Sequence, residues 1–480
     1  MKTMLEDLRH IQLKRNWLAC GLAFACCGFF VGAAAASTMI DPDPTPEPGS
    51  TLFGYAVAVA GDVNGDSVPD LVVGAPFQDG DFANPIPRFG DPQNVGKAWL
   101  IDGANLTVIR VLDDPKFQVA NTLKFGGEFG SSVAALGDIN GDGVPDVLIG
   151  VPHHNVEDQS AGTEEINVGR AFAFSGSDGT ILLTIESPSG TEGDRFGFAV
   201  AGLGDVNGDG VPDFVVGIPK KDAADGTPDV GGAYIFSGAD GSQLSELDAP
   251  ARGGLEANGR AGTALANAGD IDNDGKSDVL VGAPGNSRAF IYSGATGSLI
   301  RTILSPAKEN VPSFGFALDG GKDLNGDGTP DVVIGAPNQK RLTGIVYAFD
   351  GSTGALLRKI TTRVGAFAKF GASVKLINDV TGDHSPDILV GAPDVAVNGA
   401  ANAGQVFIYN GRNGRLFRAI ASAQPTAYSG FGFAAAAADF DNDGALELVT
   451  GAPYQDINLV IDGDTNTYLQ MGQIEIQEIQ

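Results

Sequence analysis

Short apolar runs recur along most of this chain, and turns rich in glycine and aspartate separate them. Between residues 129 and 185, four such runs follow one another at 129–136, 146–150, 170–174 and 181–185. Alternating apolar positions bounded by glycine and aspartate are typical of β-strands joined by hairpins. The pattern therefore predicts a unit of four antiparallel strands.

This unit recurs seven times along the sequence. Its first two strands are most complete at residues 196–219, FGFAVAGLGDVNGDGVPDFVVGIP, and close copies stand at 53–76, 129–152, 261–284, 314–337, 370–393 and 431–453. A strand-rich repeat of roughly 50 residues or more is typical of propeller blades. We predict an all-β fold, a seven-bladed β-propeller of four-stranded antiparallel blades, over residues 51–480.

The repeat also indicates how the blades are arranged. The small residues of each first strand suit the crowded centre of the ring, and the phenylalanine that opens most copies is expected between neighbouring blades. The seventh copy offers outer strands of its own at 458–461 and 468–476. We therefore expect the ring to close by blade packing, not by a strand from the N-terminus, where a proline-rich segment disfavours a sheet strand.

Residues 1–36 have the pattern of an export signal. Basic residues precede an uncharged run at 17–36 that ends in alanines, as at a cleavage site. The alternative is an uncleaved anchor, because this run is long enough to span a bilayer. Residues 37–50 contain alternating prolines and are expected to form a stiff linker. The expected location is secreted or at the cell surface.

The composition excludes several classes of function. The chain has 59 acidic and 30 basic side chains, a formal charge of −29, and no basic stripe of the kind that binds nucleic acid. Its three cysteines all lie in the N-terminal apolar run, so the body of the chain has no disulfide framework.

Much of the acidic excess belongs to one nine-residue loop that stands between the first and second strands of every copy. In the third copy, Asp205, Asn207 and Asp209 occupy loop positions 1, 3 and 5, and Asp213 occupies position 9. Clustered carboxylates repel one another unless a hard cation joins them, and Ca²⁺ takes six to eight oxygen ligands. Gly210 at position 6 permits the positive φ that folds such a loop around an ion.

The seven loops therefore predict up to seven Ca²⁺ sites. The loops that begin at residues 270 and 439 hold four carboxylates and are expected to bind most tightly, whereas the sixth loop, with threonine at position 3, is the weakest candidate. The alternative reading is a set of polar turns without metal. The candidate ligands are Asp62, Asn64, Asp66, Asp70, Asp138, Asn140, Asp142, Asp146, Asp205, Asn207, Asp209, Asp213, Asp270, Asp272, Asp274, Asp278, Asp323, Asn325, Asp327, Asp331, Asp379, Thr381, Asp383, Asp387, Asp439, Asp441, Asp443 and Glu447.

The repeat resembles the FG-GAP repeat of integrin α-subunit N-terminal propellers and their bacterial relatives. In the first copy its two halves are Phe53-Gly54 and Gly74-Ala75-Pro76, and most other copies have equivalents. The resemblance covers about residues 51–480. It implies a seven-bladed propeller with Ca²⁺ in the hairpin between the first and second strands of a blade. No inserted domain interrupts the blades, so the ligand recognition of integrins is not carried over to any residue here.

The function that these features favour is a calcium-binding adhesion or binding module. Its ligand would be an extracellular protein or a glycan, and membrane contact would come only through an uncleaved N-terminal segment. Loops carry recognition on rigid scaffolds. The connections between second and third strands are long at 77–96, 153–168 and 220–230, so we expect blades one to three to carry the partner site.

Two other classes of function remain open at this stage. One is a structural envelope or matrix protein. The other is a propeller enzyme such as a polysaccharide lyase or hydrolase, for which His153 and His154, beside Glu157 and Asp158, would be the candidate groups. Adjacent residues of a strand point to opposite faces, which counts against joint action, and no nucleophile motif is present. We expect no catalytic residues.

Overall fold

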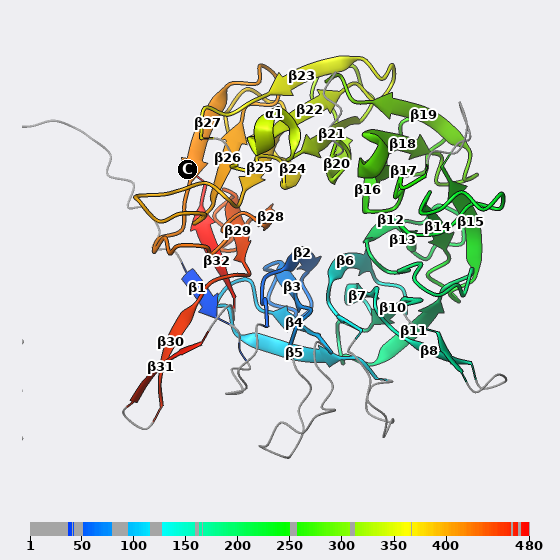
Figure 1. Ribbon diagram of the computed structural model, residues 1–480, viewed down its shortest axis with the longest axis horizontal. Helices are drawn as coiled ribbons and strands as arrows, with labels where there is room; N and C mark the ends of the chain where they lie inside the picture. The colour runs from blue at the N-terminus through cyan, green and yellow to red at the C-terminus, as the bar shows by residue number, and fades with distance from the viewer. Residues whose placement is uncertain are drawn as a thin grey trace, which may run out of the picture. The chain divides into compact units, whose positions relative to one another are not determined.

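The computed structural model is a seven-bladed β-propeller, as predicted, and Figure 1 shows its blades arranged in a ring. The sequence-predicted signal or anchor at 1–36 lies outside the described residues. The structure describes residues 37–40, 42, 51–78, 95–115, 127–158, 163–165, 167–249, 257–307, 313–365, 367–461, 464–468 and 472–479.

Blades one to six each contain four antiparallel strands in chain order from the centre outward. Blade one consists of β2 (Ala56–Gly61), β3 (Asp70–Ala75), β4 (Lys97–Ile101) and β5 (Val108–Asp113). Blade two consists of β6 (Ser132–Gly137), β7 (Asp146–Val151), β10 (Arg170–Phe174) and β11 (Ile181–Glu186). Blade three consists of β12 (Val200–Gly204), β13 (Asp213–Ile218), β14 (Gly232–Phe236) and β15 (Gln243–Asp248).

The same order continues round the ring. Blade four consists of β16 (Ala264–Gly269), β17 (Asp278–Ala283), β18 (Arg288–Tyr292) and β19 (Leu299–Leu304). Blade five consists of β20 (Ala317–Lys322), β21 (Asp331–Ala336), β22 (Ile345–Phe349) and β23 (Leu356–Ile360). Blade six consists of β24 (Ser373–Ile377), β25 (Asp387–Ala392), β26 (Gln405–Tyr409) and β27 (Leu416–Ile420).

Blade seven is assembled from both ends of the described chain. Its strands, from the centre outward, are β28 (Ala434–Ala438), β29 (Glu447–Ala452), β32 (Gln473–Glu478) and β1 (Ser37–Ile40). The strand β1 pairs antiparallel with β32, from Ser37 opposite Ile476 to Ile40 opposite Gln473. Figure 1 shows β1, in blue, beside β32, in red.

The prediction that the ring closes without an N-terminal strand was therefore wrong. The predicted outer strand at 458–461 is β30 (Ile457–Ile461), which pairs with β31 (Asp464–Tyr468) and not with the blade. The predicted strand at 468–476 overlaps β32, which is the third strand of blade seven. The prolines did not prevent pairing because they begin at Pro42, after β1 has ended. Residues 37–40 of the predicted linker thus belong to the propeller, and residues 43–50 lie outside the described residues.

The remaining elements belong to connections between second and third strands. The connection in blade two forms the hairpin of β8 (Val156–Asp158) and β9 (Thr163–Glu165), and the one in blade seven forms the hairpin of β30 and β31. The helical segments in the described part of the chain are η2 (Pro284–Asn286) and α1 (Gln339–Leu342). Within that part, no helix is long and apolar enough to cross a membrane.

The core lies between the blades. Second and third strands such as β13 and β14 are buried along their whole length because neighbouring blades cover both of their faces, whereas outer strands such as β15 are mostly exposed, with Leu247 buried. The phenylalanine that opens a repeat is fully buried between two blades, as predicted. Phe129 of blade two, for example, shares one apolar cluster with Leu100 of blade one and packs edge-on against Phe174, with ring centroids 5.8 Å apart.

Glycines in both halves of the repeat allow the backbones of adjacent blades to touch. A Cβ atom on Gly74 of blade one would lie 2.0 Å from the carbonyl oxygen of Gly130 in blade two, which no side chain can tolerate. The same contact closes the ring, where a Cβ on Gly451 would lie 2.0 Å from the carbonyl oxygen of Gly54. The Phe-Gly half of one repeat thus contacts the Gly-Ala-Pro half of the preceding repeat.

The buried phenylalanines make a direct prediction about stability. We expect Phe196→Ala to lower the free energy of unfolding by about 3–5 kcal/mol, because it removes a fully buried ring and leaves a cavity. Phe417→Ala on the outer strand β27, where the ring is 46% exposed, is the matched control and is expected to cost less than about 1 kcal/mol. Equal losses in urea unfolding would contradict this account of the core.

Candidate metal centres

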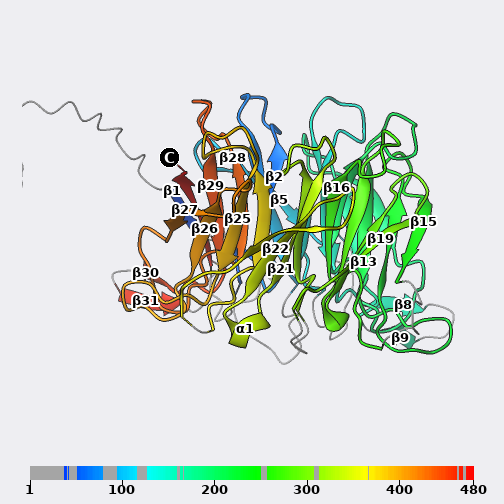
Figure 2. The ribbon, with the colours of Figure 1, turned by 90° about the horizontal axis from the view of Figure 1, so that it is seen from above.

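The seven acidic loops all lie on one face of the ring. Each connects the first and second strands of its blade, so in an antiparallel sheet it stands at the edge opposite the connections between second and third strands. Figure 2 shows three of those latter connections, marked by α1, β8–β9 and β30–β31, together at the lower edge. The candidate metal centres therefore occupy the other face.

Each loop folds around its own acidic side chains. In the third loop, the Asp205 carboxylate accepts hydrogen bonds from the backbone N–H groups of Gly208 (2.5 Å) and Gly210 (3.1 Å). Asn207 Oδ1 and Asp209 Oδ1 each accept a bond from the backbone N–H two residues further along, both at 2.8 Å. These side chains are thereby held toward the inside of the loop, as the sequence pattern predicts for a metal site.

The carboxylate at position 9 ties the loop to the rest of its blade. Asp213 is fully buried, and its two oxygens accept bonds from the N–H of Val206 at loop position 2 (2.9 Å) and of Gly238 (3.1 Å). Gly238 lies in the turn between the third and fourth strands. Both hairpins of the blade therefore meet on one buried acid.

The sequence pattern did not point to the tethering glycine, although a glycine follows the third strand in each of blades one to six. A Cβ on Gly238 would lie 1.9 Å from the carbonyl oxygen of Pro212, so this position requires glycine. Its N–H bond to the position-9 carboxylate recurs at 3.1–3.2 Å in six blades, with the glycines Gly103, Gly176, Gly238, Gly294, Gly351 and Gly411.

Three loops bring three carboxylates within 4.8 Å of one another. They are the fourth, with Asp270, Asp272 and Asp278, the sixth, with Asp379, Asp383 and Asp387, and the seventh, with Asp439, Asp441 and Glu447. Asp274 and Asp443 accept bonds from the backbone of their own loops.

The first, second, third and fifth loops form no such group of three acids among the described residues. Their position 3 is asparagine, and its amide donates to the carboxylate at position 5, as from Asn207 Nδ2 to Asp209 Oδ2 at 2.9 Å. The same bond joins Asn64 to Asp66, Asn140 to Asp142 and Asn325 to Asp327. In these four loops, an amide N–H of the position-3 asparagine thus occupies the side of the position-5 carboxylate that a cation would contact.

The sixth loop is more complete than its sequence suggests. Thr381 Oγ1 donates to Asp387 Oδ1 (3.2 Å), and Asn410, in the turn after the third strand, donates from Nδ2 to Thr381 Oγ1 (2.6 Å) and to Asp383 Oδ2 (2.7 Å). Asn410 lies far from the loop in sequence, so no motif pointed to it. The relative affinities of the seven loops remain predictions.

The donor set fits a hard divalent cation. The converging groups are carboxylate, amide and hydroxyl oxygens, which suit Ca²⁺ better than softer metals. In the seventh loop, Asp439 Oδ1 is buried and has no hydrogen-bond partner among the described residues, and a bound cation would satisfy it. When bound, Ca²⁺ would neutralise the clustered charge.

Burial sets the protonation of the position-9 acids in the ion-free protein. It raises the pKa of Asp278 and of Asp331 to about 6 and that of Glu447 to about 7, and the neighbouring acids of each loop add to the rise. Hydrogen bonds from backbone N–H groups work in the opposite direction. Protons therefore compete with a cation for these oxygens.

The histidine pair at the start of the second long loop does not form a joint site. His153 Nδ1 lies 2.8 Å from Glu128 Oε2, whereas His154 Nδ1 lies 3.3 Å from Asp114 Oδ2. The guanidinium of Arg170 donates to His154 Nε2 at 2.9 Å and also pairs with Glu186. Each histidine thus lies against a different carboxylate, and the side chains of Glu157 and Asp158 lie outside the described residues.

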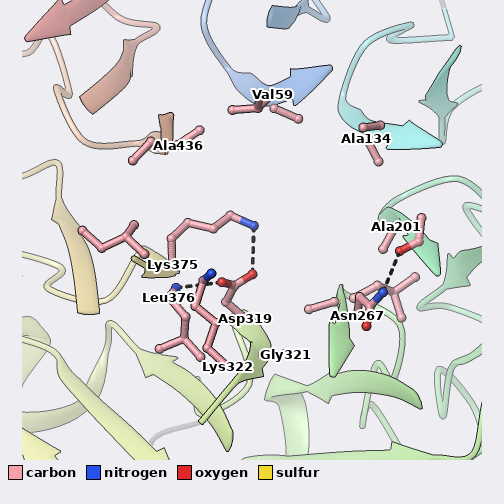
Figure 3. Close-up of a pocket in the computed structure, with 18 of the residues that line it drawn as sticks. Val59, Ala134, Ala201, Asn267, Asp319, Gly321, Lys322, Lys375, Leu376 and Ala436 are labelled. Carbon is pink, nitrogen blue, oxygen red and sulfur yellow. Dashed lines mark hydrogen bonds and ion pairs between the residues drawn. The ribbon is translucent and has the colours of Figure 1, made fainter. Parts of the chain in front are cut away.

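The centre of the ring is a channel of about 690 Å³ lined by the first strands of the blades. Most of its lining is small and apolar, as predicted, with Ala134 and Ala201 among the residues labelled in Figure 3. The charged side chains of this lining come from blades five and six. Asp319 accepts bonds from Lys375 Nζ (3.0 Å) and from the N–H of Leu376 (2.7 Å), which joins the two blades.

Comparisons with known proteins agree with this geometry. A family model described as the FG-GAP repeat matches residues 53–101, 129–163, 261–299 and 314–355, and one described as an FG-GAP-like repeat matches residues 391–450. The matched blades are FG-GAP or FG-GAP-like repeats. The third copy, at 196–219, lies outside these matches but forms blade three with the same loop and the same glycine tether.

The curated relatives of these FG-GAP blades include integrin α-subunits. Integrin alpha-5 of Xenopus laevis is 32% identical over 223 residues, which are 43% of this chain and 20% of that relative. Integrin alpha-PS3 of Drosophila melanogaster is 37% identical over 158 residues, 30% of this chain and 14% of the relative. Integrin alpha-V of Gallus gallus is 33% identical over 218 residues, 42% of this chain and 19% of the relative. The matched part is thus a fifth or less of each relative's length.

The raised pKa values predict an unusual pH dependence for the ion-free protein. The folded pKa values of Asp278, Asp331 and Glu447 lie above the unfolded values of about 4. Between the unfolded and the folded pKa of each acid, the folded state therefore binds more protons than the unfolded state. Their contribution to stability is therefore present at low pH and is lost as pH rises through about 6 to 7.

We expect the melting temperature of metal-stripped protein to fall between about pH 5 and pH 8, and the gain on adding Ca²⁺ to be larger at pH 8 than at pH 5. Thermal unfolding across this range, with and without excess Ca²⁺, is the measurement. A stripped protein that becomes more stable toward pH 8 would contradict the assignment of buried, protonated acids.

Proposed function

We propose that this chain is a secreted or cell-surface propeller that binds Ca²⁺ in its hairpin loops and acts as a binding or adhesion module. The observation that carries the proposal is the identity of its FG-GAP blades with those of integrin α-subunits at about 32%. The acidic loops with inward-facing oxygens support the metal part of the proposal. An exported location accords with the predicted signal at 1–36 and with a body that has no cysteine.

The geometry separates the two tasks of the molecule. The metal loops stand on one face and stabilise the hairpins, whereas the connections between second and third strands stand on the other face and are free to vary. Long connections occur in blades one, two and three, as predicted, in blade six at residues 393–404, and in blade seven, where β30 and β31 form a hairpin. Since blade seven adjoins blade one, the long connections form one continuous sector, which we propose as the partner site.

The long connection of blade three shows how such a loop is ordered. Asp222 Oδ1 accepts the N–H of Asp229 (2.9 Å), and Asp225 Oδ1 accepts the N–H of Thr227 (2.9 Å), so the loop holds its shape through its own acids. Asp222 and Asp225 remain exposed. An acidic, ordered loop suits a basic protein surface, or a glycan bound through Ca²⁺. Most of the corresponding loop of blade one, residues 79–94, lies outside the described residues.

The arrangement gives little support to catalysis. His153 and His154 have separate partners, and both belong to polar networks at the start of the loop of blade two. We therefore propose a binding role without an enzymatic one.

Calcium removal tests the metal part of the proposal. Excess chelator is expected to lower the melting temperature by about 10 °C or more, because several anionic loops lose their counterion at once. Re-addition of Ca²⁺ should restore the original transition. An unchanged melt after verified metal removal would refute a structural role for calcium.

The partner face is tested by loop shortening. Cutting residues 77–96 to the length of the connection in blade four is expected to abolish capture of ligands on a glycan array or in a pull-down with extracellular proteins. Folding should persist, because shortening a surface loop changes stability little. Asp240→Asn, in an exposed turn on the metal face, is the control and should bind normally. If binding survives the shortening and is lost in the control, the partner site lies on the metal face.

A further inference from the structure

Blade seven differs from the other six in how its third and fourth strands are connected. In blades one to six a short turn joins these strands, and its glycine donates an N–H to the position-9 carboxylate. In blade seven the third strand is β32 and the fourth is β1, which come from distant parts of the sequence. No turn connects them, so this blade has no tethering glycine.

The acid at position 9 of the seventh loop is correspondingly less supported. Glu447 is buried, and among the described residues one N–H donates to it, that of Phe440 at 2.6 Å. Position 3 is Asp441, which has no amide to place between the carboxylates. At position 1, Asp439 Oδ2 accepts the N–H of Gly444 (2.9 Å), but the buried Oδ1 has no hydrogen-bond partner within the part of the chain that the structure describes.

The fourth loop provides the comparison, because it carries the same number of carboxylates. Asp278 there accepts bonds from the N–H groups of Ile271 (2.7 Å) and Gly294 (3.2 Å). Both oxygens of Asp270 accept backbone bonds, from Asp274 (3.0 Å) and Gly275 (2.9 Å). With the same number of carboxylates, the fourth loop is braced by its own blade, and the seventh is not; the fourth also carries Lys276, whose Nζ lies 3.4 Å from Asp205 Oδ2 of the third loop.

The seventh loop also makes the contacts that join blade seven to blade one. In every blade from one to five, the apolar side chain at loop position 2 packs on the tethering glycine of the next blade, and Phe440 does the same across the closure. A Cβ on Gly103 of blade one would lie 2.6 Å from the Phe440 ring. Asn442 Nδ2 donates to the carbonyl oxygen of Ser67 in the first loop at 3.2 Å.

The seventh loop is connected to the closing strand β1 through β29 and β32. The first residue of β29 is Glu447 itself, β29 pairs with β32 from Glu447 to Ala452, and β32 holds the four residues of β1. Met39 of β1 packs against the apolar cluster that Phe440 shares with Trp99 of blade one. Any displacement of Glu447 is thus transmitted directly to the ring closure.

We propose that a divalent cation held by Asp439, Asp441, Asp443 and Glu447 is the lock of the ring closure. This inference rests on the cation binding of the proposed function and adds a specific role for one site. In the other six loops the second hairpin supplies part of the restraint, and in the seventh the cation replaces it. Loss of the cation therefore opens the ring at β1 and β32 before it affects the other blades.

Hydrogen exchange of the full chain, followed by mass spectrometry during stepwise removal of Ca²⁺, tests this order of events. We expect exchange in peptides covering 37–40 and 473–478 to accelerate about tenfold or more at a Ca²⁺ concentration where β13 and β14 of blade three change less than about twofold. Uniform acceleration, or earlier opening of blade three, would overturn the proposal.

A matched pair of variants assigns the effect to the seventh loop. Asp441→Asn gives this loop the residue that four other loops carry at position 3, and Asp272→Asn makes the same change in the braced fourth loop. The first variant should raise by about tenfold the Ca²⁺ concentration needed to protect β1, and the second should leave that concentration unchanged within about twofold. An equal shift from Asp272→Asn would refute a special role for the seventh loop. If Asp441→Asn fails to fold, the exchange order in the unaltered chain still decides.

Calorimetric titration of the metal-stripped protein with CaCl₂ distinguishes a failure of calcium binding from a failure of the lock. If no Ca²⁺ binds, the metal part of the proposed function fails together with the lock. If Ca²⁺ binds and exchange in β1 responds no earlier than in blade three, the lock alone fails. Neither measurement involves the adhesion partner, so the binding role is judged separately.

Discussion

A buried carboxylate that accepts two backbone N–H groups is the interaction on which each of the first six blades depends. It fixes the loop between the first and second strands through position 2 and the turn between the third and fourth strands through its glycine. In blades one to five, the side chain at position 2 packs on the glycine of the following blade, so the same acid also sets the contact between blades. The acidic loops are therefore parts of the inter-blade joints.

This construction places negative charge where the fold is most constrained. A buried acid without a countercharge disfavours its ionised form, and the neighbouring acids at positions 1, 3 and 5 increase the cost. Backbone amides offset part of it, and the cation of the proposed function would offset the rest. The ordered hairpins of the proposed function would then depend on a supply of divalent cations.

Rigidity of the ring is what makes the opposite face useful. The glycine contacts between blades leave no room for adjustment, so connections of different length project from a fixed frame. The long connections gather on blades six, seven, one, two and three, on either side of the ring closure. A cation that locks the closure would consequently also fix the relative positions of the two halves of the proposed partner site.

The sequence by itself determined the repeat, the four-stranded blade, the number of blades and the set of acidic loops, because these features are periodic and local. Alternation within a strand, glycine at a turn and oxygen-bearing side chains at loop positions 1, 3, 5 and 9 are each readable within a few residues. The tethering glycine also recurs in the sequence after the third strand, but its hydrogen bond to the position-9 carboxylate is not evident there.

Only the tertiary structure decided which distant segments meet. The closing strand Ser37–Ile40 is too short to stand out, and its partner Gln473–Glu478 is more than four hundred residues away in sequence. The support of the sixth loop by Asn410, the separation of His153 from His154, and the missing tether at Glu447 likewise depend on contacts across strands. Such contacts follow from how the ring closes, which no local pattern records.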